Sequence, residues 1–345
     1  MNTKNVSRRE LMGAAALAAT ALSAGSRAAA ETTAPTPDIK LGLYSITYLG
    51  VWYRGDALTP AQVVDRAKEY GYQGMELDGK RPHGDPLDMN KYLCRELRRY
   101  ADRQGIEIYA VAGNNDFSSP IPELREAELV YFRELIRMTA DLDVKLMRVF
   151  LAWPGVTTVP EGGARYDETF RLWDLAHKGV PDERTWDWCR DGLRESVKYA
   201  ADHGITLALQ NHPPVIHGYR DVLRMLKEVD SPNLTVCFDP RLEHEMRPED
   251  VVRVTREIGP LQALSHYGNE YTEENGVIVA KEDENLPAQI KGLAEIGYRG
   301  YLGFELCHQL PQVNGRLSGM DFVDKNARLA AKYARDLITA ASRQA

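Results

Sequence analysis

The chain has 345 residues, of which 43% are hydrophobic and 27% charged, a composition typical of a globular protein with a large core. Its formal net charge of −7 argues against a nucleic-acid partner, because such binding depends on Lys and Arg contacts to phosphate. Outside the N-terminus, no stretch approaches the ~20 apolar residues needed to span a bilayer, so we expect no membrane span in the mature protein.

The first thirty residues have the pattern of an export signal. Arg8-Arg9 precedes a mildly apolar run over residues 13–25, and Ala28-Ala29-Ala30 then supplies small residues suited to cleavage. This order resembles a bacterial twin-arginine (Tat) signal. The resemblance implies that residues 1–30 are removed and that the mature protein is periplasmic. The Pro/Thr-rich residues 31–38 are expected to form a linker.

Changing both Arg8 and Arg9 to lysine should leave the uncleaved precursor in the cytoplasm, because the arginine pair is the part of the signal that the export machinery reads. Cell fractionation followed by immunoblotting measures this directly. Unchanged export of the double-lysine variant would contradict the Tat interpretation.

The rest of the chain repeats one pattern eight times. A short apolar run is followed by an amphipathic helical stretch, which often begins as Thr59-Pro60 does and ends at a glycine such as Gly71. The runs show little alternation, as expected of strands buried on both faces of a parallel sheet. The predicted strands are residues 39–48, 74–78, 106–112, 146–153, 205–212, 234–240, 261–268 and 300–306.

Eight strand–helix units predict an α/β fold, a single-domain (β/α)₈ TIM barrel over residues 39–345. The alternative, an open doubly wound sheet, would place a Gly-rich GxGxxG turn after an early strand, and none occurs. The longest insertion, at about residues 154–184, follows the fourth strand and is expected to form a lid over the barrel mouth. The four cysteines have no CxxC spacing and are expected to be buried, unpaired thiols.

Polar residues end four consecutive strands in the second half of the chain. In a TIM barrel the carboxyl ends of the strands face the active site, so these side chains should converge. Carboxylate and amide oxygens together with one imidazole suit Mn²⁺, Mg²⁺, Co²⁺ or Zn²⁺. The predicted ligands are Gln210, Asp239, His266 and Glu305.

Short phrases at these strands resemble the xylose isomerase-like barrels of the sugar phosphate isomerase/epimerase superfamily. They include the stretch at residues 67–77, Leu-Ala-Leu-Gln-Asn-His at residues 207–212, and Gly-Phe-Glu at residues 303–305. The resemblance implies a metal held at positions 210, 239, 266 and 305 that chelates two oxygens of a hydroxy-carbonyl substrate. The family usually has Glu where this chain has Gln210, and Gln cannot act as a base. Glu305 is then the remaining carboxylate of the family's acid/base pair.

These observations predict a metal-dependent sugar isomerase/epimerase that works by enolisation of a keto-sugar. A lyase or dehydratase performing β-elimination on a keto-sugar or keto-glycoside is the alternative, because only one base remains. A catalytically silent sugar-binding or partner-subunit barrel is a further alternative. An exported enzyme is expected to act on an unphosphorylated sugar or polyol, and a homo-oligomer is left open.

Further candidates lie close to the ends of the predicted strands. His212 follows Gln210 by two residues, so on a regular strand it points the same way, and we consider it a catalytic candidate. The others are candidates for contact with substrate. They are Glu76, Asn114, Arg148, Trp153 and His244.

Overall fold

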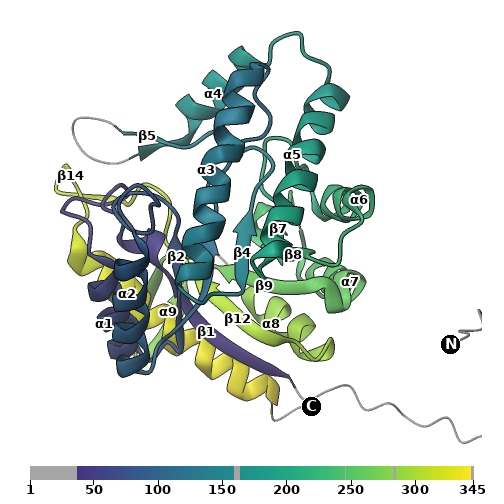
Figure 1. The fold of residues 1–345 in the computed structure, drawn as a ribbon. Coiled ribbons are helices and arrows are strands. Elements are labelled where there is room, and N and C mark those ends of the chain that lie inside the picture. The colour runs from purple at the N-terminus through teal and green to yellow at the C-terminus, as the bar shows by residue number, and fades with distance from the viewer. Residues whose placement is uncertain (1–36, 159–163, 245, 283–284, 343–345) are drawn as a thin grey trace, which may run out of the picture. The chain divides into compact units, whose positions relative to one another are not determined.

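A computed structural model describes residues 37–158, 164–244, 246–282 and 285–342. The proposed signal and residues 31–36 of the linker lie outside the described residues. The described residues form one compact unit built around a closed barrel (Figure 1).

Eight parallel strands close the barrel, which confirms the predicted fold class. Each strand pairs with its neighbours in chain order, and β1 pairs with β12 to close the ring. The strands are β1 (Asp38–Tyr44), β2 (Gly74–Asp78), β3 (Glu107–Ala112), β4 (Leu146–Val149), β7 (Thr206–Gln210), β8 (Leu234–Phe238), β9 (Gln262–Tyr267) and β12 (Arg299–Phe304).

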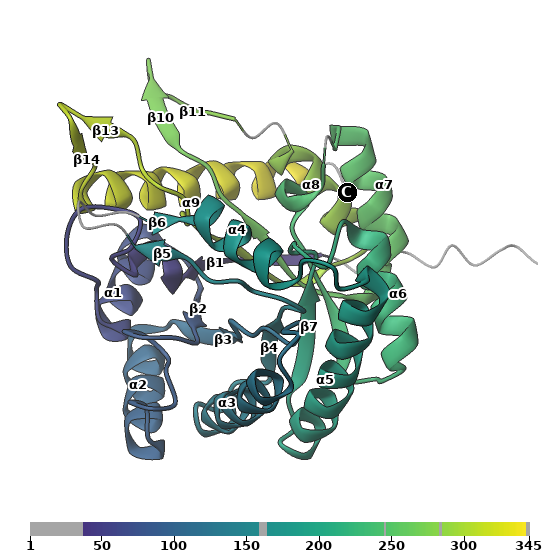
Figure 2. The same cartoon turned by 90° about the horizontal axis from the view of Figure 1, so that it is seen from above.

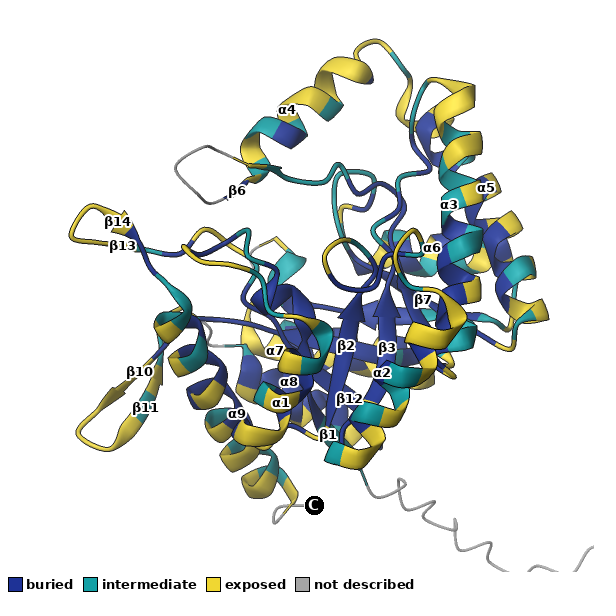
Figure 3. Cartoon of the chain, turned by 60° about the vertical axis from the view of Figure 1, so that its left-hand side comes forward, coloured by how far each residue is buried: buried dark blue, intermediate teal, exposed yellow. Residues whose placement is uncertain are grey.

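Helices surround the barrel, and their outer faces are exposed while the strands are buried (Figure 3). Local sequence sets their ends: Thr59 and Gln62 form a reciprocal capping box at the start of α1, and Gly71 ends that helix with φ at 78°. The helices are α1 (Pro60–Tyr70), α2 (Lys91–Gln104), α3 (Pro122–Asp141), α4 (Tyr166–Ala176), α5 (Asp182–Asp202), α6 (Tyr219–Val229), α7 (Pro248–Ile258), α8 (Leu286–Glu295) and α9 (Met320–Ser342).

Several strands are shorter than their apolar runs predict. Residues 45–48 form a 3-10 turn, η1 (Ser45–Tyr48), instead of extending β1. Strand β4 ends at Val149, and Phe150 and Trp153, which follow it, pack against the ring of His212. Asp239 and Glu305 each follow directly after a strand, so they occupy the loops at its carboxyl end.

The insertion after β4 contains the short strands β5 (Thr157–Thr158) and β6 (Ala164–Arg165) and helix α4 (Figure 2). Two further hairpins, β10 (Tyr271–Glu274) with β11 (Val277–Ala280) and β13 (Gln312–Val313) with β14 (Arg316–Leu317), follow β9 and β12. All of these additions therefore come from loops that follow the carboxyl ends of barrel strands.

Tyr109 fills the barrel interior beneath the mouth. Its ring stacks on Tyr301 with centroids 4.0 Å apart, and glycines on neighbouring strands leave room for it. A Cβ at Gly42 would lie 2.4 Å from the Tyr109 hydroxyl, so only glycine is tolerated there without a shift. The barrel interior is thus packed with side chains, as is usual for this fold.

All four cysteines are unpaired thiols, as predicted; Cys94, Cys189 and Cys237 are buried as well, whereas Cys307 is only partly buried. Among the described residues, no helix is both long enough and apolar enough to cross a membrane.

Candidate active site at the carboxyl end of the barrel

A cavity of about 410 Å³ opens at the carboxyl end of the barrel. Arg148, Gln210, His212, Arg241 and Glu305 are its main polar residues. Its apolar and aromatic walls come from β1, the loop after β4, and helix α4 of the insertion. They include Tyr44, Ile46, Phe150, Trp153, Tyr166 and Phe170.

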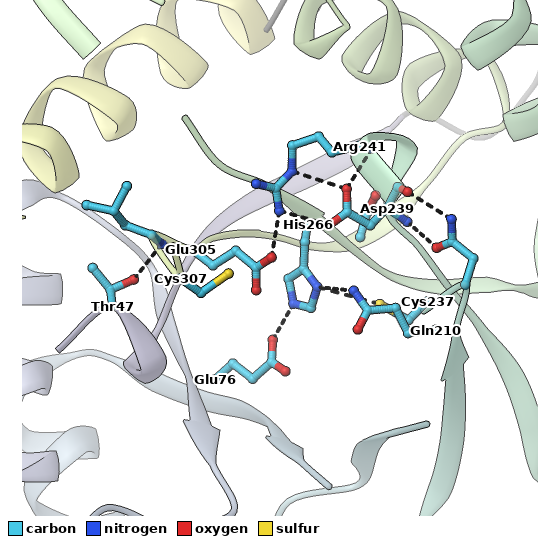
Figure 4. A network of polar contacts seen from close by, with 12 residues as sticks. Thr47, Glu76, Gln210, Cys237, Asp239, Arg241, His266, Glu305 and Cys307 are labelled. Atoms are coloured by element: carbon cyan, nitrogen blue, oxygen red, sulfur yellow. Dashed lines mark hydrogen bonds and ion pairs between the residues drawn. The ribbon is translucent and has the colours of Figure 1, made fainter. Parts of the chain in front are cut away.

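On one side of the cavity, Arg241 lies between two carboxylates (Figure 4). Its Nη2 donates to Asp239 Oδ2 at 2.8 Å and to Glu305 Oε1 at 2.6 Å. Burial alone would raise the pKa of Glu305, but Arg241, His266 and Arg148 outweigh it and lower the pKa to about 2. Glu305 is therefore an ionised carboxylate at neutral pH. Its Oε2 accepts no hydrogen bond from the described residues.

On the other side, Arg148 joins two strands. Its Nε donates to Glu76 Oε1 at 2.8 Å and its Nη1 donates to Gln210 Oε1 at 2.5 Å. The second Glu76 oxygen accepts from His266 Nε2 at 2.6 Å. Burial opposes ionisation of Glu76, but His266 and Arg148 outweigh it and lower the Glu76 pKa, while Glu76 raises the pKa of His266. Glu76 is thus a buried anion held by two cationic partners.

The four predicted metal ligands lie at the same end of the barrel, but each of them is bound to another side chain. Asp239 and Glu305 hold Arg241, and Gln210 accepts from Arg148. The Nε2–H of His266 donates to Glu76, and the Nδ1 of His266 lies 3.4 Å from the amide nitrogen of Gln210. Within the described part of the chain, no group of three or more His, Cys, Asp or Glu residues is placed to hold an ion. The predicted ligand set does not fit a divalent metal in this arrangement.

His212 completes the polar part of the cavity. Its ring packs edge-on against Phe150 and Trp153, with centroid distances of 5.0 and 4.8 Å. Its Nδ1 lies 2.6 Å from the carbonyl oxygen of Pro213, and a carbonyl only accepts, so Nδ1 carries the proton. Burial lowers the pKa of His212 to about 4, so the ring is neutral at pH 7 and Nε2 has a free lone pair.

The other predicted contact residues divide into two groups. Asn114 and Trp153 line the cavity, and Asn114 donates to Asp78 at 2.8 Å. Glu76 does not line it, because Arg148 and His266 cover both of its oxygens. His244, two residues after η2 (Pro240–Leu242), is exposed and does not line the cavity. Glu76 and His244 thus lie outside the lining of this cavity, and their contacts with substrate stay predictions.

Sequence reasoning missed Arg241 and the aromatic wall formed by Tyr44, Phe150 and Tyr166. The sequence did contain a pattern that could have indicated Arg241, because this basic residue follows Asp239, at the end of a predicted strand, by two positions. No sequence pattern indicated the aromatic wall, because its residues come from three separate elements that only the fold brings together.

The chain matches the family described as "Xylose isomerase-like TIM barrel" over residues 64–326. It belongs to this family. A comparison with curated protein sequences gives no significant match.

Several solved structures, two of them of epimerases, share the fold. A D-psicose 3-epimerase from Clostridium cellulolyticum H10 is 19% identical in sequence, with a TM-score of 0.64. The superposition covers 87% of this chain and 99% of the epimerase chain. The 3-keto-D-glucoside 4-epimerase YcjR from E. coli is 16% identical, with a TM-score of 0.61. The superposition covers 87% of this chain and 99% of the YcjR chain. The IolI protein, solved with a bound zinc atom, is 16% identical, with a TM-score of 0.58. The superposition covers 88% of this chain and 98% of the IolI chain.

Proposed function

We propose that this family member is a sugar isomerase or epimerase that moves a proton on the carbon next to a substrate carbonyl. The observation that carries the proposal is that Glu305 and His212 both line one cavity, which also has an aromatic wall. A sugar ring offers apolar C–H faces to such a wall and hydroxyl groups to the polar side chains. The sugar substrates named for the structural relatives agree with this class of substrate.

Glu305 is the group that takes the proton. It is ionised and directs one oxygen toward Arg241, which leaves Oε2 to accept a proton from the substrate carbon. Neutral His212 is the second group, since its Nε2 can accept a proton from a hydroxyl and return one to the substrate. Two proton-transfer groups of different type thus occupy the cavity in which the family usually has two carboxylates.

Arg148 supplies a hydrogen-bond donor for the substrate oxygen. The side chain lines the cavity and is buried, yet its Nη2 has no partner among the described residues. An unsatisfied buried donor is costly, so a ligand oxygen placed there is stabilised. A charged N–H aimed at the carbonyl oxygen would stabilise the negative charge that develops on enolisation.

A lyase that performs β-elimination is the second candidate, and Gln210 is the observation that favours it. Gln210 occupies the position of the family's usual second carboxylate and is bound to Arg148, so it cannot reprotonate the opposite face of the substrate. Elimination needs only one base and departure of a leaving group. Retention of an ionised Glu305 in the cavity weighs against a catalytically silent barrel.

A second cavity of about 650 Å³ shares Phe170 and Pro213 with the first. Trp173, Trp186 and Arg224 are among its lining residues. The two spaces together could hold a glycoside whose sugar ring lies beside Glu305 and whose substituent extends past Phe170. This size, together with the proposed export to the periplasm, favours unphosphorylated keto-sugars and keto-glycosides as substrates.

The proposal is tested by incubating the protein in D₂O with free sugars, glycosides and their 3-keto forms. Solvent deuterium should appear at the carbon next to the carbonyl, and NMR distinguishes an epimer from an elimination product. Absence of both exchange and product across the panel would contradict proton-transfer chemistry on this substrate class.

The rate should depend little on pH from about 8 down to about 5 and should fall near pH 4. Burial penalises the His212 cation and lowers its pKa to about 4, so the neutral, proton-accepting form persists above that value and is lost as pH falls through it. The measurement is kcat/KM from pH 3.5 to 8.5. An acidic limb near pH 6.5, the ordinary histidine value, would contradict the lowered pKa of His212, and a rate that is unchanged down to pH 3.5 would exclude His212 in this role.

A further inference from the structure

One guanidinium holds both carboxylates of the predicted metal set. Arg241 lies in the 3-10 turn η2, which Asp239 caps, so its side chain folds back onto that carboxylate. Its backbone N–H and Nε–H donate to Asp239 Oδ1 at 3.0 and 3.2 Å, and Nη2–H donates to Oδ2 at 2.8 Å. Nη2 also donates to Glu305 Oε1 at 2.6 Å. Both oxygens of Asp239 and one of Glu305 are therefore bound to a cation that the chain itself carries.

The backbone beside this guanidinium leaves space for it. Gly268 follows β9 directly, and a Cβ at this position would lie 2.4 Å from Arg241 Nη1 and 2.2 Å from the backbone oxygen of Glu305. Gly268 does not have a positive φ, so the glycine is needed for space and not for its backbone conformation. Any larger residue at position 268 would push the guanidinium away from the two carboxylates.

The remaining predicted ligands are also taken up by protein groups. Gln210 Oε1 accepts from Arg148, and His266 Nε2 donates to Glu76. The cavity is thus flanked by two guanidinium cations, Arg148 and Arg241, and arginine does not lose its proton in proteins. Fixed positive charges repel an incoming divalent ion, and that ion would also have to displace Arg241 from both carboxylates.

We propose that Arg241 takes the place of the divalent metal ion in this barrel, so that the protein works with an internal guanidinium cation and without a bound metal. In this arrangement Arg241 neutralises the buried Asp239, orients Glu305 and presents a positive charge to the substrate oxygens in the cavity. The inference does not depend on which sugar is turned over, because metal binding is measured directly.

The first measurement is metal content of the purified wild-type protein. After incubation with excess Mn²⁺, Co²⁺ or Zn²⁺ and desalting, the protein should retain less than about 0.1 equivalent of any of these ions per chain. The reason is that the predicted ligands are already bound to other side chains. EDTA should leave its thermal midpoint unchanged. Retention of one equivalent, with a midpoint lowered by EDTA, would overturn the proposal even if no sugar substrate had been found.

The second measurement uses variants at position 241. Arg241→Ala frees both carboxylates and should bind Mn²⁺ at least about tenfold more tightly than wild type in calorimetry, with a thermal midpoint that rises on adding Mn²⁺. Arg241→Lys keeps a monovalent cation and should remain metal-free. Arg256→Ala, which removes an exposed arginine from α7, is the matched control and should not gain Mn²⁺ binding.

A folded Arg241→Ala protein that binds Mn²⁺ no better than wild type would also overturn the proposal, because Arg241 would then not be what occupies the ligand position. If Arg241→Ala does not fold, the metal content of wild type and of Arg241→Lys decides between the outcomes. Lack of sugar turnover in a metal-free wild-type protein would instead count against the proposed function alone.

Discussion

Replacing Glu305 with glutamine should lower turnover by about 10²–10⁴-fold, the usual cost of losing a general base. Glutamine has the same shape and can still accept a hydrogen bond from Arg241, but it cannot take a proton. The expected loss is therefore in kcat, with little change in substrate binding. The rate of α-proton exchange in D₂O isolates the proton-transfer step.

Two controls make this result specific. Glu257→Gln changes a carboxylate on α7 that is 46% exposed and should leave the rate unchanged. Metal content measured on the same samples separates loss of a base from any change in ion binding. Full turnover by Glu305→Gln would show that the assignment is wrong, and His212 would then be the leading candidate for the base.

Replacing Arg148 with methionine should lower the free energy of unfolding by about 3–5 kcal/mol, the cost typical of removing one partner of a buried ion pair. The Arg148 side chain is 3% exposed and its partner Glu76 is 0% exposed, so water cannot replace the lost guanidinium. Arg148 also packs over the rings of Tyr44 and Phe150, and methionine retains only part of that contact. Urea denaturation measures the change.

A double-mutant cycle identifies the buried charge as the cause. Adding Glu76→Gln to Arg148→Met removes the anion that has lost one of its two cationic partners, Arg148, and keeps only His266, so it should recover part of the loss. The matched control Arg256→Met removes an arginine whose side chain is 58% exposed and should change stability by less than about 1 kcal/mol. An Arg148→Met protein as stable as wild type would contradict the view that Arg148 and Glu76 form a coupled buried pair.

The barrel was predictable because its signals are local. Eight apolar runs and the glycines after the helices mark the strands and their order, and the structure has the predicted barrel. The ends of the strands were less predictable. Residues 150–153 continue the apolar run of β4, yet Phe150 and Trp153 turn away and pack on His212. An apolar run has the same appearance in sequence whether it continues a strand or forms the wall of a cavity.

The candidate site was predictable in position but not in its pairings. Gln210, Asp239, His266 and Glu305 do lie at the carboxyl end, because strand order alone determines that. Their partners depend on where long side chains turn, and no local pattern specifies that Arg241 folds back to bridge two carboxylates. Buried acidic residues without a visible partner in the sequence can thus be satisfied either by a metal or by an arginine.

The packing of Tyr109 inside the barrel has a kinetic consequence. Tyr109 and Tyr301 line a hollow at the opposite end of the barrel, and that hollow shares no residue with the cavity that holds Glu305. The two ends are separated by the Tyr109 ring seated against the glycines of neighbouring strands. Substrate and product therefore both enter and leave at the carboxyl end of the barrel. Because both occupy the site beside Glu305, product should compete with substrate for the empty site, and inhibition by product should be competitive.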